Sequence, residues 1–441
     1  MKFKKTFSVE IFHIVNSDDF LARGEDDIIT TYKEKMENIL SQNNNILRIL
    51  SDEVAKQGFA GSTKIPELVY LTLITGLLEE PVSLLIKGPS GAGKSFSLRM
   101  GKQFIPTEAY EEFEGMSEKA LVYLDIDLKH KHLIIGEAAG MANGSGRTLI
   151  RQLLSEGQVR YATVQSTDRG LEGAELPALE GPCGLIMTTT ATNIHPEDEN
   201  RMLSMNMHES PDQIMAALIA QAEGNSKKKY KPNLAPWFEL YRSIKNGSKN
   251  VSIPFAKKIA KQLPLTHDKI KRDFPQVLSL IKASALIHSK NRAIDEDGAV
   301  VANEDDYALV RNLVNAALSE GLAKTVPATV RKLVEAVEKL TDTRHKGALS
   351  NGVSHSKLAE YLDRDQSVIS RTAKQAVEDG YLRNNNPGQG REAELVVGDR
   401  KLPSGSVLPS TNLLFDEQPE REYAPWECTA PAKPKRRTID W

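Results

Sequence analysis

Eight consecutive residues have the types and spacing of a phosphate-binding loop. They are Gly88-Pro89-Ser90-Gly91-Ala92-Gly93-Lys94-Ser95, which fit the pattern G-x-x-x-x-G-K-[ST]. The glycines allow the backbone to come close to an anion, because they have no Cβ. Lys94 would reach the β- and γ-phosphates of a nucleoside triphosphate, and the Ser95 hydroxyl would hold Mg²⁺. The sequence therefore predicts a site for ATP and Mg²⁺.

The segments on either side of this loop are those that must position it. Residues 82–86 form a short apolar run that is typical of a buried parallel strand, and residues 96–102 favour a helix. In that order the loop N–H groups and the helix N-terminus face the phosphates, which favours anion binding. The alternative is a chance glycine-rich turn, against which the flanking strand and helix argue.

Hydrolysis of ATP also requires a carboxylate that orients the attacking water. Residues 133–135 are a second apolar run, and Glu137 follows them after Gly136. We expect Glu137 to polarise the water. The run at 121–124, which ends at Asp125, is a competing position, and for either acid the alternative is a solvated carboxylate at a strand end.

Two later residues complete the predicted constellation. Residues 184–188 predict another strand, and the amide of Asn193 beyond it could hold the lytic water or sense the γ-phosphate. Arg201 precedes an apolar run at 202–205, where an arginine could reach the γ-phosphate of a neighbouring subunit. The alternatives are a Thr-rich surface turn for the first and an ordinary surface charge for the second.

Composition limits the classes of function. The chain has 441 residues, enough for roughly two to four domains. Its net charge of −2 provides no global basic field, so any DNA contact must come from local patches. The two cysteines, Cys183 and Cys428, exclude a disulfide framework and make a zinc site unfavourable. Without a signal-peptide pattern or an apolar run of about 18 residues, we expect a cytoplasmic protein with no membrane partner.

The alternation of short apolar runs and helices predicts an α/β fold with a mostly parallel sheet. Further along, three predicted helices and two predicted strands follow in the order of a winged helix. We therefore expect a helical N-terminal region (1–60), an α/β core with the phosphate-binding loop (61–210), a helical lid (211–325), a winged helix-turn-helix (326–402) and a disordered tail (403–441).

The order of these parts over residues 61–320 resembles the AAA+ ATPases. It is most similar to the helix-2 insert branch, which holds the minichromosome maintenance helicases and their mobile-element relatives. Residues 116–121 and 135–140 also resemble the ATPase portion of primase-helicases from phages and integrative elements. The sequence departs from the family at Gly136, where many such ATPases have a metal-contacting Asp.

The resemblance implies a role for each matched residue. Glu137 takes the place of the catalytic acid, Asn193 of sensor 1, Arg201 of the arginine finger and Arg272 of the sensor-2 arginine. It further implies a homo-oligomeric ring, a hexamer in the family, and a β-hairpin inserted into the second helix near residues 153–181. Arg160 and Arg169 would be the contacts of that hairpin with DNA or with a protein partner.

The predicted winged helix would place residues 366–379 in the major groove of DNA. Ser367, Arg371 and Lys374 are suited to contact bases and phosphates there. However, residues 354–400 hold seven Lys and Arg against eight Asp and Glu, a poor balance for tight DNA binding. A structural or protein-binding winged helix is the alternative.

The first functional hypothesis is an ATP-hydrolysing DNA helicase or translocase in the replication of a phage or mobile element. Its partners would be DNA and proteins of the replication machinery. The second is an ATP-dependent regulator that remodels a protein at a DNA site through the winged helix. The third is a slow, nucleotide-gated binding module, which Gly136 keeps open.

Overall fold

The computed structural model describes most of the chain between residues 40 and 415. The described ranges are 40–117, 120–124, 126–136, 145–168, 170–190, 196–207, 211–224, 230–264, 269–324, 326–341, 352–388, 391–402 and 406–415. Four residues singled out by the sequence, Asp125, Glu137, Arg169 and Asn193, lie outside them. None of the helices in these ranges is both long and apolar enough to cross a membrane.

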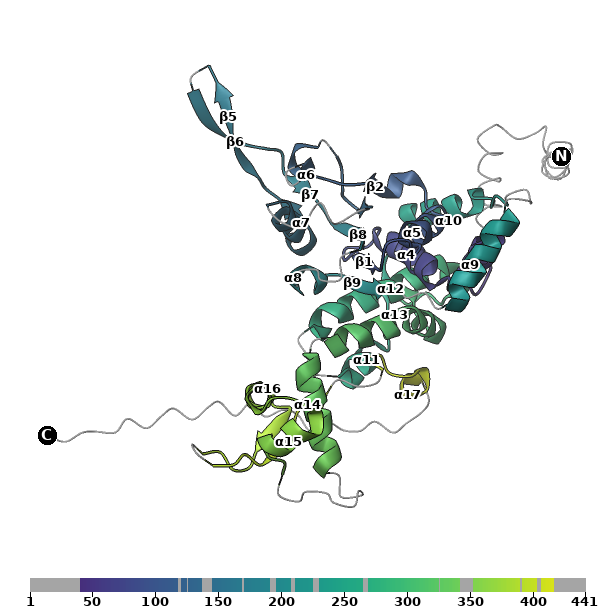
Figure 1. Ribbon diagram of the computed structural model, residues 1–441. Helices are drawn as coiled ribbons and strands as arrows, with labels where there is room; N and C mark the ends of the chain where they lie inside the picture. The colour runs from purple at the N-terminus through teal and green to yellow at the C-terminus, as the bar shows by residue number, and fades with distance from the viewer. Residues whose placement is uncertain are drawn as a thin grey trace, which may run out of the picture.

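A parallel sheet of five strands forms the centre of the molecule (Figure 1). Its order is β2 (Tyr110–Phe113), β3 (Lys131–Ile135), β8 (Cys183–Thr189), β1 (Leu84–Lys87) and β9 (Leu203–Asn206). Every neighbouring pair is parallel. The predicted α/β fold with a parallel sheet is therefore confirmed, and all five carboxyl ends meet at one edge.

Both faces of the sheet are covered, which explains why its inner strands are apolar runs without alternation. On β1, Leu84 and Ile86 face one hydrophobic core, and Leu85 faces the other. Helices α4 (Lys64–Thr75) and α5 (Lys94–Lys102) contribute buried residues to the first core, and α7 (Ser145–Glu156) contributes to the second. These covering helices come from the segments before and between the strands of the sheet.

The first core continues beyond the sheet into the helices predicted for residues 211–325. These helices are α9 (Pro211–Gly224), α10 (Ala235–Asn246), α11 (Ala256–Gln262), α12 (Ile270–Ile287) and α13 (Glu304–Lys324). Buried residues of α10 to α13 belong to the same core as α4 and the sheet. The helical block is thus built onto the sheet rather than around a core of its own.

Two terminal segments depart from the predicted division. Helix α3 (Ile46–Lys56) belongs to the predicted N-terminal region, yet it buries its apolar face in the first core. Residues 406–415, predicted as disordered, fold back and include helix α17 (Thr411–Phe415). Leu408 and Leu414 are buried there, and the Tyr307 hydroxyl donates to the Pro409 carbonyl at 2.7 Å. The prolines of this segment indicated disorder, although Leu408 and Leu414 are buried apolar residues.

The strand predictions were wrong at one position and incomplete at two others, since β2 and β9 were not predicted, and β9 was noted only as the apolar run at 202–205. The apolar run at 121–124 largely forms a short helix, α6 (Ala120–Tyr123), so Asp125 does not follow a strand. Strand β2 was not predicted, because its sequence Tyr-Glu-Glu-Phe is short and charged. It lies at the edge of the sheet, where charged side chains are common.

A β-hairpin projects from the sheet domain, as the upper left of Figure 1 shows. Its base is the antiparallel pair β4 (Gln158–Val159) and β7 (Leu179–Glu180), and its arm is the pair β5 (Ala162–Thr167) and β6 (Gly170–Glu175). It lies between α7 and β8, which corrects the expected insertion within a helix. Gly157, with a φ of +69°, ends α7 and directs the chain into β4.

A third hydrophobic core lies in the C-terminal part of the described chain. It is formed by α14 (Ala328–Thr341), α15 (His355–Leu362), α16 (Gln366–Glu378) and the antiparallel strands β12 (Leu382–Asn384) and β13 (Leu395–Val397). Ser354 caps α15 by accepting a hydrogen bond from the Lys357 N–H at 3.4 Å. The predicted order of three helices and two strands is confirmed.

Candidate nucleotide-binding site

The phosphate-binding loop connects the carboxyl end of β1 to the N-terminus of α5. Gly91 and Gly93 have φ values of +85° and +76°, the left-handed region that favours glycine. Gly93 is the N-cap of α5 and provides no side chain to cap it. The first N–H groups of α5 therefore remain available to an anion.

Lys94 lies at the first position of α5 and is only 8% exposed. Its Nζ donates to the carbonyl oxygens of Gly88 and Pro89, each at 2.8 Å. Among the described residues no carboxylate pairs with this ammonium. A buried charge held by neutral carbonyls alone is poorly compensated, so an arriving phosphate would stabilise it. Ser95, the next residue, is exposed and accessible to a metal ion.

The two strands beside β1 hold the start of the loop. The Gly88 N–H donates to the Thr189 carbonyl at 3.3 Å, and the Met207 N–H donates to the Lys87 carbonyl at 2.7 Å. A Cβ on Gly88 would lie only 3.1 Å from the Met207 Cβ. The first glycine of the loop therefore packs closely against the residue that follows β9, and a side chain at position 88 would require Met207 to shift.

The end of β3 lies at the same edge of the sheet as the loop. The Thr188 hydroxyl of β8 donates to the Gly136 carbonyl, which ties the ends of β8 and β3 together. Because β8 separates β3 from β1, the two strand ends are roughly 10 Å apart. Glu137 directly follows Gly136, and Asn193 comes after β8 in the sequence. Each residue therefore follows a strand whose carboxyl end lies beside the loop.

One carboxylate at this edge was missed by the sequence. Glu114 follows β2, and its Oε2 lies 2.8 Å from the position that a Cβ on Gly136 would occupy. It was missed because β2 itself was not predicted. The sequence Tyr-Glu-Glu-Phe offers no alternation of apolar and polar residues that could have indicated the strand before Glu114.

The two predicted arginines lie at the opposite edge of the sheet. Arg201 and Arg272 line one pocket of about 450 Å³, together with Ser83 before β1 and Cys183 at the start of β8. The strand from Ser83 to Gly88 spans about 16 Å. Neither arginine is therefore placed to act on the phosphate-binding loop of its own chain.

The arginine pocket has a polar wall and a protonated thiol. The Arg201 Nη1 donates to the Ser155 hydroxyl at the end of α7, and its Nη2 lies 3.4 Å from Glu197 Oε1. Arg272, in α12, is exposed. Burial raises the pKa of the Cys183 thiol to about 12, so this group does not serve as a nucleophile at neutral pH.

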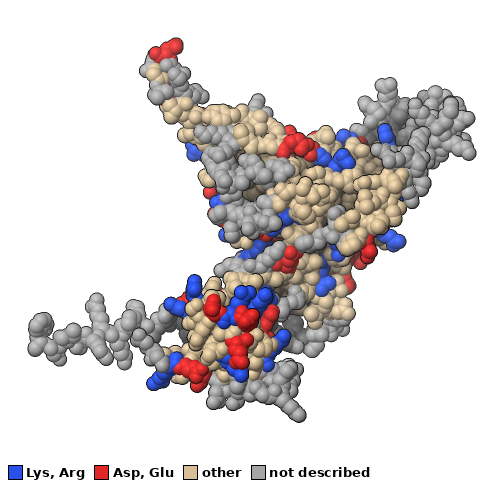
Figure 2. Space-filling model, in the orientation of Figure 1, with Lys and Arg blue, Asp and Glu red and all other residues tan. Residues whose placement is uncertain are grey.

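The hairpin places its predicted contact residue at the base rather than at the tip. Arg160 is engaged in an ion pair with Glu175, with an Nη2 to Oε1 distance of 2.6 Å. The described charged residues farther along the arm are acids, Asp168 and Glu172, and Figure 2 shows acidic side chains at the far end of the hairpin. The described acids of this part would repel the phosphates of DNA.

The outer face of α16 presents the predicted DNA contacts to solvent. Ser367, Arg371 and Lys374 are exposed, and Ile369 and Ala373 on the other face are buried in the third core. The Lys374 Nζ lies 4.0 Å from a carboxylate on the following turn, a weak surface pair. Figure 2 shows acidic and basic side chains mixed on this part of the molecule.

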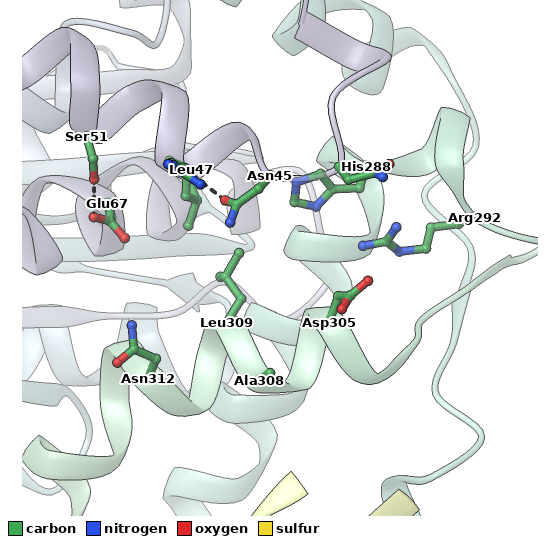
Figure 3. A pocket seen from close by; sticks show the side chains of 12 residues that line it. Asn45, Leu47, Ser51, Glu67, His288, Arg292, Asp305, Ala308, Leu309 and Asn312 are labelled. Carbon is green, nitrogen blue, oxygen red and sulfur yellow. Dashed lines mark hydrogen bonds between the residues drawn. The ribbon is translucent and has the colours of Figure 1, made fainter.

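A second polar pocket, of about 690 Å³, lies between α3, α4, α12 and α13, and contains none of the predicted site residues. Figure 3 shows Ser51 bonded to Glu67, and Asn45 bonded to the N-terminal turn of α3. His288 accepts a hydrogen bond from the Ile46 N–H at 3.1 Å. The Ser51 and His288 bonds join α3 to α4 and to the end of α12, and the Asn45 bond caps α3, which indicates a structural role.

Magnesium would find few protein ligands here. In the described ranges no three or more His, Cys, Asp or Glu side chains gather closely enough to hold a metal ion. The Ser95 hydroxyl fits Mg²⁺, which is usually bound by few protein groups together with phosphate oxygens and waters.

A scan against models of protein families finds no match for this chain, and a search of curated proteins finds none either.

Proposed function

We propose that this chain is an ATP-hydrolysing P-loop ATPase of the AAA+ type, with sites completed by neighbouring copies. The observation that supports it most is Lys94, a buried ammonium at the uncapped N-terminus of α5 that has only carbonyl partners. The γ-phosphate of ATP would supply the missing negative charge, and Ser95 would hold Mg²⁺. The metal would neutralise charge that develops on the phosphates.

The order of the strands supports the roles of Glu137 and Asn193. Each residue follows a strand whose carboxyl end lies at the edge of the loop. Glu137 would orient the attacking water and accept its proton, and Asn193 would hold that water in line with the γ-phosphate. Arg201 and Arg272 lie at the opposite edge, so they would act on the nucleotide of a neighbouring copy.

An assembly of copies is also consistent with the surface of α9. Ile214, Met215, Leu218 and Ile219 are exposed on this helix. Clusters of exposed apolar side chains are typical of contact surfaces. In a head-to-tail ring each copy would present its loop to one neighbour and its arginines to the other.

Two activities would use such an ATPase, and the hairpin distinguishes between them. A DNA helicase or translocase needs cationic side chains that follow the phosphates. The described hairpin instead has acids along its arm, and its Arg160 is already paired. This favours the second candidate, remodelling of a protein partner at a DNA site to which the winged helix formed by α14–α16 and β12–β13 would bind.

The proposal is tested by ATP binding and turnover in the full chain. We expect Lys94→Ala to abolish ATP binding, and Glu137→Gln to bind ATP but to hydrolyse it at least a hundredfold more slowly, as a lost catalytic group predicts. Binding that survives Lys94→Ala would overturn the ATPase assignment.

Turnover and strand unwinding measured with and without single- and double-stranded DNA then separate the two activities. Unwinding that Glu137→Gln abolishes would identify a helicase, and hydrolysis without unwinding would favour the remodeller. Very slow turnover under all conditions would identify the gated binding module.

A further inference from the structure

Position 136 at the end of β3 has no side chain, and a neighbouring carboxylate fills the space. A Cβ on Gly136 would lie 2.8 Å from the Glu114 Oε2 and 3.4 Å from the Glu114 Cα. Real Cβ atoms do not approach other atoms as closely as the first of these distances. The Glu114 carboxylate thus occupies the space in which a side chain at position 136 would begin, and, as the end of a flexible side chain, it can also move from there.

This space faces α5, the helix that begins with Lys94 and Ser95. Along β3, Ile134 packs in the first core with α5, and Ile135 packs in the second. Because side chains alternate along a strand, a side chain at position 136 would lie on the α5 side of the sheet. The carboxylate of Glu114 lies there instead.

Strand β2 shows the same orientation from its own contacts. The Lys102 Nζ of α5 lies 5.5 Å from the centre of the Tyr110 ring, and it forms an ion pair with Glu112. Glu114 shares this face and lies roughly 7 Å farther toward the carboxyl edge of the sheet. Since α5 begins at that edge, Glu114 is displaced from Lys102 toward the turn that holds Ser95.

Glu114, the residue after β2, also differs in its partners from the two acids of that strand. The Glu111 Oε1 lies 2.8 Å from the Lys131 Nζ, and Glu112 pairs with Lys102. For Glu114 no ion pair or hydrogen bond is found within the described ranges. Among the described acids of residues 110–114, Glu114 is therefore the one without a cationic partner.

We propose that Glu114 supplies the carboxylate of the magnesium shell that position 136 lacks. This inference rests on the proposed ATPase function. Three strand spacings, roughly 14 Å, separate β2 from β1, so Glu114 would act on the waters of the metal ion rather than bind it directly. Magnesium commonly keeps several waters, and carboxylates orient them by accepting hydrogen bonds.

The test measures nucleotide binding by the full chain as a function of Mg²⁺ concentration. We expect Glu114→Gln to raise the Mg²⁺ concentration at half-saturation about tenfold, the scale of a lost outer-shell partner, and to leave ATP binding in EDTA unchanged. Glu111→Gln is the matched control, since it removes a carboxylate from the other face of the same strand. It should leave the Mg²⁺ response unchanged.

A swap of the two positions separates a specific role from a structural one. The double variant Glu114→Gly with Gly136→Asp should recover most of the Mg²⁺ response, because the aspartate then has the vacated space. An unchanged Mg²⁺ response in Glu114→Gln, in a protein where Lys94→Ala abolishes ATP binding, would overturn this inference alone. ATP binding that survives Lys94→Ala would instead overturn the ATPase function on which it rests.

Discussion

At the scale of single residues, His132 shows how a polar group is kept neutral inside the sheet domain. It is fully buried on β3, and its Nε2 lies 3.0 Å from the Val82 carbonyl, to which it donates. Glycines leave room for the ring, because a Cβ on Gly184 would lie 2.2 Å from the Nε2 and a Cβ on Gly76 would lie 2.9 Å from the Nδ1. Burial lowers the pKa of His132 to about 4.

This pKa predicts a loss of stability in mild acid. Below pH 6.5 a proton binds to His132 in the unfolded chain but not in the folded chain. The free energy of unfolding therefore decreases as the pH is lowered from about 6.5 to about 4. The loss between pH 7.5 and 5 should be about 2 kcal/mol. Urea unfolding followed by tryptophan fluorescence would measure it, and His132→Gln should reduce the pH dependence by that amount. An identical pH dependence in the variant would contradict the assignment.

The strand, loop and helix around residues 88–95 could be predicted because their signals are local: an apolar run, glycines that adopt positive φ, and a helix that follows at once. The binding of a phosphate there remains a prediction. Glu114 could not be found in this way. Its position depends on the pairing of β2 with β3 and on the missing side chain of Gly136, which are contacts between segments distant in sequence.

At the scale of elements, α16 and the hairpin present side chains of opposite charge. The exposed face of α16 has Arg371 and Lys374, whereas the described arm of the hairpin has Asp168 and Glu172. If the protein binds DNA, the contact should therefore depend on α16 and not on the hairpin.

The double variant Arg371→Ala with Lys374→Ala should weaken the binding of full-length protein to duplex DNA. We expect the slope of log affinity against log salt concentration to fall by about two, one for each lost phosphate contact. Lys332→Ala with Lys339→Ala, which removes two exposed lysines of α14, is the matched control. Equal slopes in all three proteins would exclude α16 as the DNA-binding helix.

Elements with a strong local signal, either helical periodicity or an uninterrupted apolar run, could be predicted, and those set by tertiary contacts could not. The helices of residues 211–325 and the strands β1, β3 and β8 were expected close to their observed positions. The edge strand β2 and helix α17 were not, because their sequences are charged or proline-flanked. The apolar run of α6 was short enough to fit either a strand or a helix, and in the structure it forms a helix that contacts α7.

At the scale of the whole molecule, the residues predicted to act in one reaction lie in two groups at opposite edges of the sheet. The phosphate-binding loop lies at the carboxyl edge, and Arg201 and Arg272 share a pocket at the other edge. A single chain therefore does not bring these arginines to its own phosphate-binding loop. If both halves belong to one active site, that site forms where two copies meet.

Mixing two inactive variants tests this claim most directly. Lys94→Ala keeps the arginines but loses the loop lysine, and Arg201→Ala keeps the loop but loses the arginine. Each alone should hydrolyse ATP at least a hundredfold more slowly than the unmodified protein. In an equal mixture, random assembly pairs an intact loop with an intact arginine at roughly a quarter of the interfaces, so about a quarter of the activity should return. A mixture no more active than its components would contradict sites shared between copies.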